Sequence, residues 1–217
     1  MIWLKEFLKL NKILAALLLF HIAIAFYFYL RIRGLFITAS PMGVWLNIIS
    51  MNTFYFSIFE KPLYITGCAL AILQFYPEVE KRRFRISCHL PANEYITLAK
   101  MIFFAIAAIS VFGLIDALSV LLVSAGYFPY EIFSETPIII FYWYINALLF
   151  YAVAAVLTLE PSWKAKVRLF LILAAFYKLV DVSIYNSPKV YIIYLIIIAA
   201  LFVSTIFYPA ERFRRGV

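Results

Sequence analysis

Five charged side chains interrupt stretches that are otherwise apolar, and they are the first candidates for chemistry. They are Glu60, Lys61, Asp116, Lys178 and Asp181. A charged side chain at the centre of a bilayer costs about 3 kcal/mol, so these residues should face protein or a water-filled cavity. They could line a substrate path, or they could form internal ion pairs and reach toward the membrane surface, which we favour. Lys178 and Asp181 lie three residues apart on one face of a helix and can pair.

Enzymatic chemistry in the membrane would need a more complete arrangement. An aspartyl hydrolase needs two carboxylates that share a site, and neither Asp116 nor Asp181 has a glycine-rich flank for a substrate backbone. His89 and Cys88 are adjacent but have no third partner, while His21 is expected to pack or to form a hydrogen bond between helices. No cluster of cysteine and histidine has the spacing of a metal site. We therefore assign no catalytic residue and no metal ligand.

The composition is that of a protein embedded in lipid. Of 217 residues, 66% are hydrophobic and only 14% are charged, whereas about a quarter of a soluble domain is charged. This balance excludes a soluble enzyme, a disordered chain and a disulfide-stapled secreted domain. The net charge of +8 does not indicate nucleic acid as a partner, because the basic residues lie between apolar runs rather than on a soluble face.

The apolar residues form six stretches that can cross a membrane as helices. About 20 residues suffice, since a helix rises 1.5 Å per residue and the hydrocarbon core is about 30 Å thick. The stretches are 13–30, 53–76, 99–124, 138–159, 169–185 and 190–208. We predict an all-α polytopic protein, a single transmembrane domain over 1–217, whose last two helices form a hairpin. Residues 35–51 are expected at the outer interface, and the first stretch is expected to be retained as a helix.

The distribution of lysine and arginine predicts the orientation. Fourteen of the 19 basic residues fall on one side of the predicted spans. These are Lys5, Lys9, Lys12, Lys81, Arg82, Arg83, Arg85, Lys100, Lys164, Lys166, Arg168, Arg212, Arg214 and Arg215. Because short loops rich in lysine and arginine remain in the cytoplasm, both termini are predicted to be cytoplasmic.

The longest polar segment between spans is the cytoplasmic loop at 77–98. On charge alone, a basic loop that touches anionic lipid is favoured over a short helix that binds a cytoplasmic partner. The order of residues in the loop, in contrast, favours the short helix that binds a cytoplasmic partner. The loop resembles the one between spans two and three of ABC-2 type transporter permeases, with an acidic–basic opening, an amphipathic coupling helix, Leu-Pro and a lysine. The matching positions are Glu78, Glu80, Lys81, Phe84, Ile86, Leu90, Pro91, Ile96, Leu98 and Lys100.

Two departures from the family pattern are visible. Arg82, Arg83 and Arg85 make this loop more basic than is usual in the family. The turn at 186–189 leaves no room for the outer re-entrant segment that many such exporters carry between the last two spans.

The resemblance implies a permease subunit that exports a substrate across the inner (cytoplasmic) membrane. It implies a partner ATPase in the cytoplasm that binds ATP and magnesium, and a second permease subunit, identical or different, beside membrane lipid. The chain itself has no Gly-x-x-x-x-Gly-Lys-Ser/Thr loop and is expected to be non-catalytic, without its own cofactor. The residues expected to contact the ATPase are Glu78, Glu80, Lys81, Arg82, Arg83, Phe84, Arg85, Ile86, Leu90 and Pro91. A structural or assembly subunit of a larger membrane complex is the alternative, and an intramembrane enzyme is the least favoured.

Overall fold

The computed structural model describes residues 2–51, 54–80, 94–134, 136–183 and 188–215, and every regular element in these ranges is helical. The long helices are α1 (Ile2–Thr38), α3 (Glu60–Glu80), α5 (Glu94–Tyr127), α7 (Thr136–Leu159), α8 (Trp163–Ser183) and α9 (Pro188–Thr205). The short ones are α2 (Pro41–Met51), η1 (Ser57–Phe59), α6 (Tyr130–Phe133) and α10 (Phe207–Arg215). The predicted all-α class is confirmed for this part of the chain.

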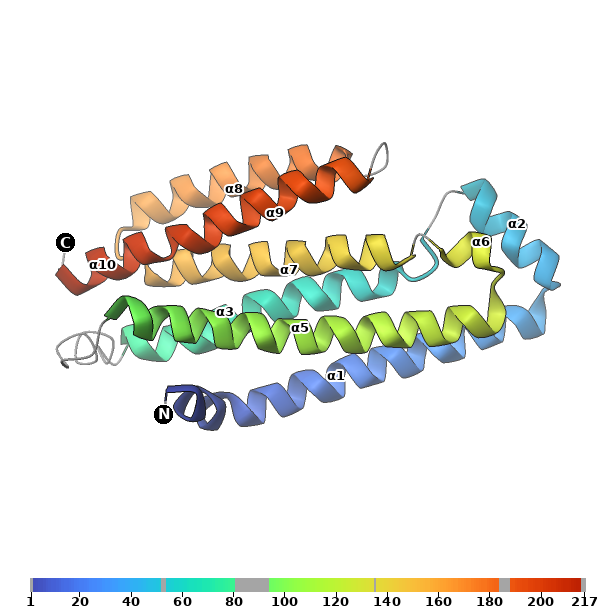
Figure 1. Ribbon diagram of the computed structural model, residues 1–217, viewed down its shortest axis with the longest axis horizontal. Helices are drawn as coiled ribbons and strands as arrows, with labels where there is room; N and C mark the ends of the chain where they lie inside the picture. The colour runs from blue at the N-terminus through green and yellow to red at the C-terminus, as the bar shows by residue number, and fades with distance from the viewer. Residues whose placement is uncertain (1, 52–53, 81–93, 135, 184–187, 216–217) are drawn as a thin grey trace.

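The long helices run side by side and alternate in direction along the chain (Figure 1). The start of α1, the end of α3, the start of α5, the α7–α8 turn and α10 lie together at what we call the basic end. The opposite end, called the far end, carries α2, η1 and α6 (Figure 1). Helix α1 lies along one side of the bundle, and α8 and α9 pack on α7 along the other side.

Among the described residues, five helical segments are long and apolar enough to cross a membrane. They are Trp3–Thr38, Ser57–Glu80, Tyr95–Tyr127, Tyr130–Leu159 and Ile192–Arg212. The length and composition of these segments indicate a multi-pass membrane protein. Residues 169–183 of the remaining predicted stretch, 169–185, belong to α8, and the last two lie outside the described residues. Helix α8 has 21 residues and is therefore about 31 Å long. Its crossing of the membrane stays a prediction.

Helix α1 is much longer than the predicted stretch at 13–30. It has 37 residues and a length of about 55 Å, so several turns extend beyond a hydrocarbon core of about 30 Å. The sequence explains the extension, because no proline occurs before Pro41, which begins α2. Residues 35–51, expected to be interfacial, are divided between the last turn of α1 and the separate helix α2 at the far end.

The tightest packing is between α3 and α7. Gly67 makes this approach possible, because a Cβ atom at this position would overlap the carbonyl oxygen of Ala147. Leu70, Phe75 and Tyr151 are fully buried around the same contact. Large apolar side chains elsewhere remain on the outside of the bundle, as expected for faces that contact acyl chains rather than water.

Candidate functional site

The last turn of α3 is tied to the first turns of α1 by charged side chains. Glu78 is buried, and its Oε1 atom lies 3.1 Å from Nζ of Lys9 and 3.6 Å from Nζ of Lys5. Lys9 also donates a hydrogen bond of 2.5 Å to the backbone carbonyl of Gln74. We call these contacts the latch. They fix the point at which the chain leaves α3 toward residues 81–93.

One turn earlier on α3, the buried amide of Gln74 connects four helices. Its Nε2 atom donates to Oε2 of Glu6 in α1 at 3.2 Å and to the carbonyl of Met101 in α5 at 2.9 Å. Its Oε1 atom accepts a hydrogen bond of 2.8 Å from the hydroxyl of Tyr151 in α7. Three bonds to three different helices make this side chain the main polar crossing point near the basic end.

The predicted ATPase-contact segment begins within the latch, at Glu78. Glu78 and Glu80 lie in the last turn of α3, where Glu80 is exposed. The other predicted contact residues, from Lys81 to Pro91, lie outside the described residues, and their role stays a prediction. Among the described residues, the ion-pair partners of Glu78 are Lys5 and Lys9 of α1.

A second polar cluster lies deeper in the bundle, where His21, Thr66 and Asp116 are all buried. The Nδ1 atom of His21 lies 2.9 Å and 3.0 Å from the two carboxylate oxygens of Asp116, and its Nε2 atom lies 2.9 Å from the Thr66 hydroxyl. The ring stacks on Phe112, with centroids 5.0 Å apart. We call His21, Thr66 and Asp116 the buried triad. It joins α1, α3 and α5 by one histidine side chain.

The triad places a hydroxyl, an imidazole and a carboxylate in the order used by nucleophilic hydrolases. Because the carboxylate lies on Nδ1, we assign a hydrogen to that nitrogen, so that Nε2 accepts a hydrogen bond from the Thr66 hydroxyl. Thr66 is, however, fully buried, so no substrate reaches its hydroxyl in this arrangement. The geometry therefore supports a cross-link between helices rather than catalysis, and Asp116 faces protein as its desolvation cost requires.

The other residues predicted for a substrate path lie elsewhere. Glu60 and Lys61 form the first turn of α3, and Thr66 is six residues further along, about 9 Å along the axis. The two charges therefore lie at the far end of the bundle rather than deep inside a span. Lys178 and Asp181 belong to α8, but their side chains lie outside the described part of the structure, and their pairing stays a prediction.

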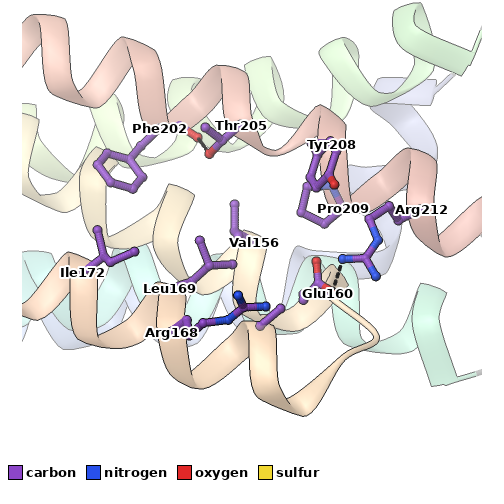
Figure 2. Close-up of a pocket in the computed structure, with 11 residues that line it drawn as sticks. Val156, Glu160, Arg168, Leu169, Ile172, Phe202, Thr205, Tyr208, Pro209 and Arg212 are labelled. Atoms are coloured by element: carbon purple, nitrogen blue, oxygen red, sulfur yellow. Dashed lines mark hydrogen bonds and ion pairs between the residues drawn. The ribbon is translucent and has the colours of Figure 1, made fainter. Parts of the chain in front are cut away.

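A cavity of about 420 Å³ opens between α7, α8 and the α9–α10 segment near the basic end (Figure 2). At one side Glu160, which is buried, accepts a hydrogen bond of 3.0 Å from Nη1 of Arg212. Arg168 reaches from α8 into the same cavity, and Tyr208 lies along its rim (Figure 2). The remaining wall is mostly apolar and includes Leu169, Ile172 and Phe202. We call this the α8–α10 cavity.

Most of these contacts are not predicted from the sequence. For His21 a hydrogen bond between helices is among the expectations, but not its partners, and neither the bonds of Gln74 nor the Glu160–Arg212 pair is predicted. One sequence pattern could have identified the latch. Lys5 and Lys9 are four residues apart, as are Gln74 and Glu78, so each pair lies on one face of its helix.

Searches with protein-family models, among curated proteins and among solved structures find no match to this chain. What the chain does is therefore inferred from its own residues and their geometry.

Proposed function

We propose that this chain is the membrane-spanning permease subunit of an ATP-binding-cassette transporter. It would pair with a second permease subunit and export a substrate across the cytoplasmic membrane, using ATP hydrolysed by a separate cytoplasmic ATPase. All six long helices would cross the bilayer. The basic end, with both termini, would face the cytoplasm, in agreement with the excess of lysine and arginine in its segments.

The observation that carries the proposal is the anchoring of α3 at the residue that opens the segment resembling the family's cytoplasmic loop. Glu78 opens that segment and is held by Lys9 and Lys5 of α1. Gln74, one turn earlier, bonds to α1, α5 and α7. A force applied to the loop by an ATPase would therefore reach four helices through side chains with fixed partners. A loop that only touches lipid headgroups transmits no force to the helices, so it would not require these bonds between α3 and its neighbours.

The predicted contact is tested by removing the apolar side chains that would enter the ATPase. The double variant Phe84→Asp, Leu90→Asp should insert in the membrane normally but lose the ATPase during purification in mild detergent. The physical reason is that two carboxylates would be buried without partners in an apolar cleft, and such anchors dominate interface energies. The measurement is the amount of copurified ATPase and its ATP turnover.

The matched control is Trp163→Asp. Trp163 is 76% exposed at the α7–α8 turn, so this variant changes an apolar side chain at the same end without touching the loop. It should retain the ATPase. If the loop variant retains the ATPase and full turnover, the loop is only a basic anchor at the membrane. A partner of another kind, bound in equal amount, would favour the assembly-subunit alternative.

The orientation is tested separately with single cysteines. A cysteine at Lys164, near the basic end, should react with membrane-impermeant maleimide only after the cells are opened. A cysteine at Glu131 in α6, at the far end, should react in intact cells. The reverse pattern would contradict cytoplasmic termini.

A further inference from the structure

The charges of the α8–α10 cavity leave one cationic group available to a ligand. Arg212 is paired with Glu160 at 3.0 Å, and the backbone N–H of Ser162 also donates to Glu160 at 3.3 Å. The carboxylate is thus compensated within the protein. Arg168 has only a weak hydrogen bond, from its Nε atom to the carbonyl of Lys164 at 3.4 Å, and no acidic partner among the described residues.

The surroundings of Arg168 add to this positive charge. Lys164 and Lys166 precede it in the first turns of α8, and the six residues from Trp163 to Arg168 contain no acidic residue. Arg212 adds a second guanidinium to the cavity wall. A ligand in this cavity would therefore be negatively charged at the end that meets Arg168.

The rest of the cavity favours a ligand with an apolar tail. Leu169 and Ile172 continue along α8 away from the basic end, and Phe202 faces them from α9 (Figure 2). Trp163 and Tyr208 are 76% and 66% exposed near the charged end. Exposed tryptophan and tyrosine are typical of the headgroup level of a membrane, so the charged part lies at the interface and the apolar wall lies deeper.

We propose that the α8–α10 cavity binds an anionic phospholipid of the cytoplasmic leaflet. The phosphate-bearing headgroup lies against Arg168 and on the side of Arg212, and the first part of an acyl chain lies along Leu169, Ile172 and Phe202. Basic pockets between helices on the cytoplasmic side suit anionic headgroups. This inference goes beyond the permease function and does not depend on an ATPase partner; only the choice of leaflet rests on the proposed orientation.

The test is a titration of the purified, delipidated full-length chain with two lipids of equal acyl chains, followed by native mass spectrometry. Phosphatidylglycerol should bind about fivefold more tightly than phosphatidylcholine, because one basic residue contributes about that factor at an anionic headgroup. Arg168→Gln should remove this preference. Lys100→Gln removes an exposed charge from the start of α5 at the same end and should leave the preference unchanged.

A second variant tests the acyl part of the site without changing charge. Ile172→Trp fills the cavity and should lower the affinity for both lipids, whereas Ile193→Trp, at an exposed position of α9 outside the cavity, should not. Millimolar inorganic phosphate should fail to displace phosphatidylglycerol. The proposal is overturned by equal affinity for the two lipids, by an unchanged preference in Arg168→Gln, or by displacement with phosphate, which would indicate a simple anion site.

Discussion

The helices of this bundle form two groups that are held together by different interactions. In the first group, α1, α3, α5 and α7 are joined by buried side-chain hydrogen bonds centred on His21 and Gln74. The second group, α8, α9 and α10, packs mainly against α7. In its described part, the polar connection to α7 is the partly exposed pair of Glu160 and Arg212.

This difference indicates how each group behaves in lipid. Apolar packing between helices has little driving force in a bilayer, because acyl chains compete equally well for the same surfaces. Buried hydrogen bonds, in contrast, fix which residues face each other. We therefore expect α1, α3, α5 and α7 to move as one unit, and α8 to α10 to shift against α7 with less resistance. The cavity between α7 and the second group agrees with this expectation.

Breaking the buried triad should have the largest effect on stability. Asp116→Ala leaves the Nδ1 atom of the buried His21 without its hydrogen-bond partner and should lower the free energy of unfolding in mixed micelles by about 3 kcal/mol. Ser119→Ala is the control on the same helix, since its hydroxyl bonds only to the Ile115 carbonyl one turn earlier. Equal losses in the two variants would mean that the triad does not hold the first group together.

Filling the space between α3 and α7 should have the second-largest effect on stability. Gly67→Ala places a methyl group on the Ala147 carbonyl oxygen, and we expect a loss of about 2.5 kcal/mol from overpacking. Gly34→Ala is the matched change in α1, where a Cβ atom meets nothing within 4 Å. It should be neutral or stabilise the helix by about 0.5 kcal/mol. Thermal unfolding of both variants in detergent distinguishes these outcomes, and a tolerated Gly67→Ala would contradict the close approach.

Removing the side-chain hydrogen bonds of Gln74 should lower the free energy of unfolding by somewhat less. Gln74→Leu deletes three side-chain bonds, and at about 0.6 kcal/mol per bond between helices in a membrane the loss is about 2 kcal/mol. Tyr151→Phe removes only one of these bonds and should lose about 0.6 kcal/mol. A ratio near one between the two losses, measured by unfolding in mixed micelles, would show that the bonds to Glu6 and Met101 contribute nothing.

The smallest effect is expected in the second group. Arg212→Gln should lower the free energy of unfolding by about 0.5 kcal/mol, because Arg212 is 30% exposed and the backbone N–H of Ser162 still donates to Glu160. The free energy of unfolding is measured in mixed micelles, as for Asp116→Ala. A loss as large as that of Asp116→Ala would remove the distinction between the two groups of helices.

Hydropathy predicted where most helices lie, because a span of about 20 apolar residues leaves an unambiguous pattern. It predicted the bounds of α1 poorly, because the charged residues Lys5, Glu6 and Lys9 are typical of the segment that precedes a span. In the structure these residues belong to the helix and pack against α3. The pairing of His21 with Asp116 could not be predicted. These residues are 95 positions apart, and helical periodicity determines which face a residue occupies but not which helix lies opposite.

The central claim is that the latch connects an ATPase-binding loop to the first group of helices. It is tested most directly by comparing Glu78→Ala with Glu80→Ala, because Glu78 is buried against Lys9 while Glu80, two residues away, is exposed. Each variant carries one reactive cysteine at Ile37, an exposed position at the far end of α1, with Cys68 and Cys88 replaced by serine.

The measurement is the maleimide labelling rate at position 37 in the complex with the ATPase, with and without ATP. ATP should change this rate in the parent protein and in Glu80→Ala. In Glu78→Ala the apolar contacts of Phe84 and Leu90 should keep the ATPase bound, but the change in rate should disappear. An unchanged response in Glu78→Ala, or no response to ATP in the parent complex, would contradict the claim.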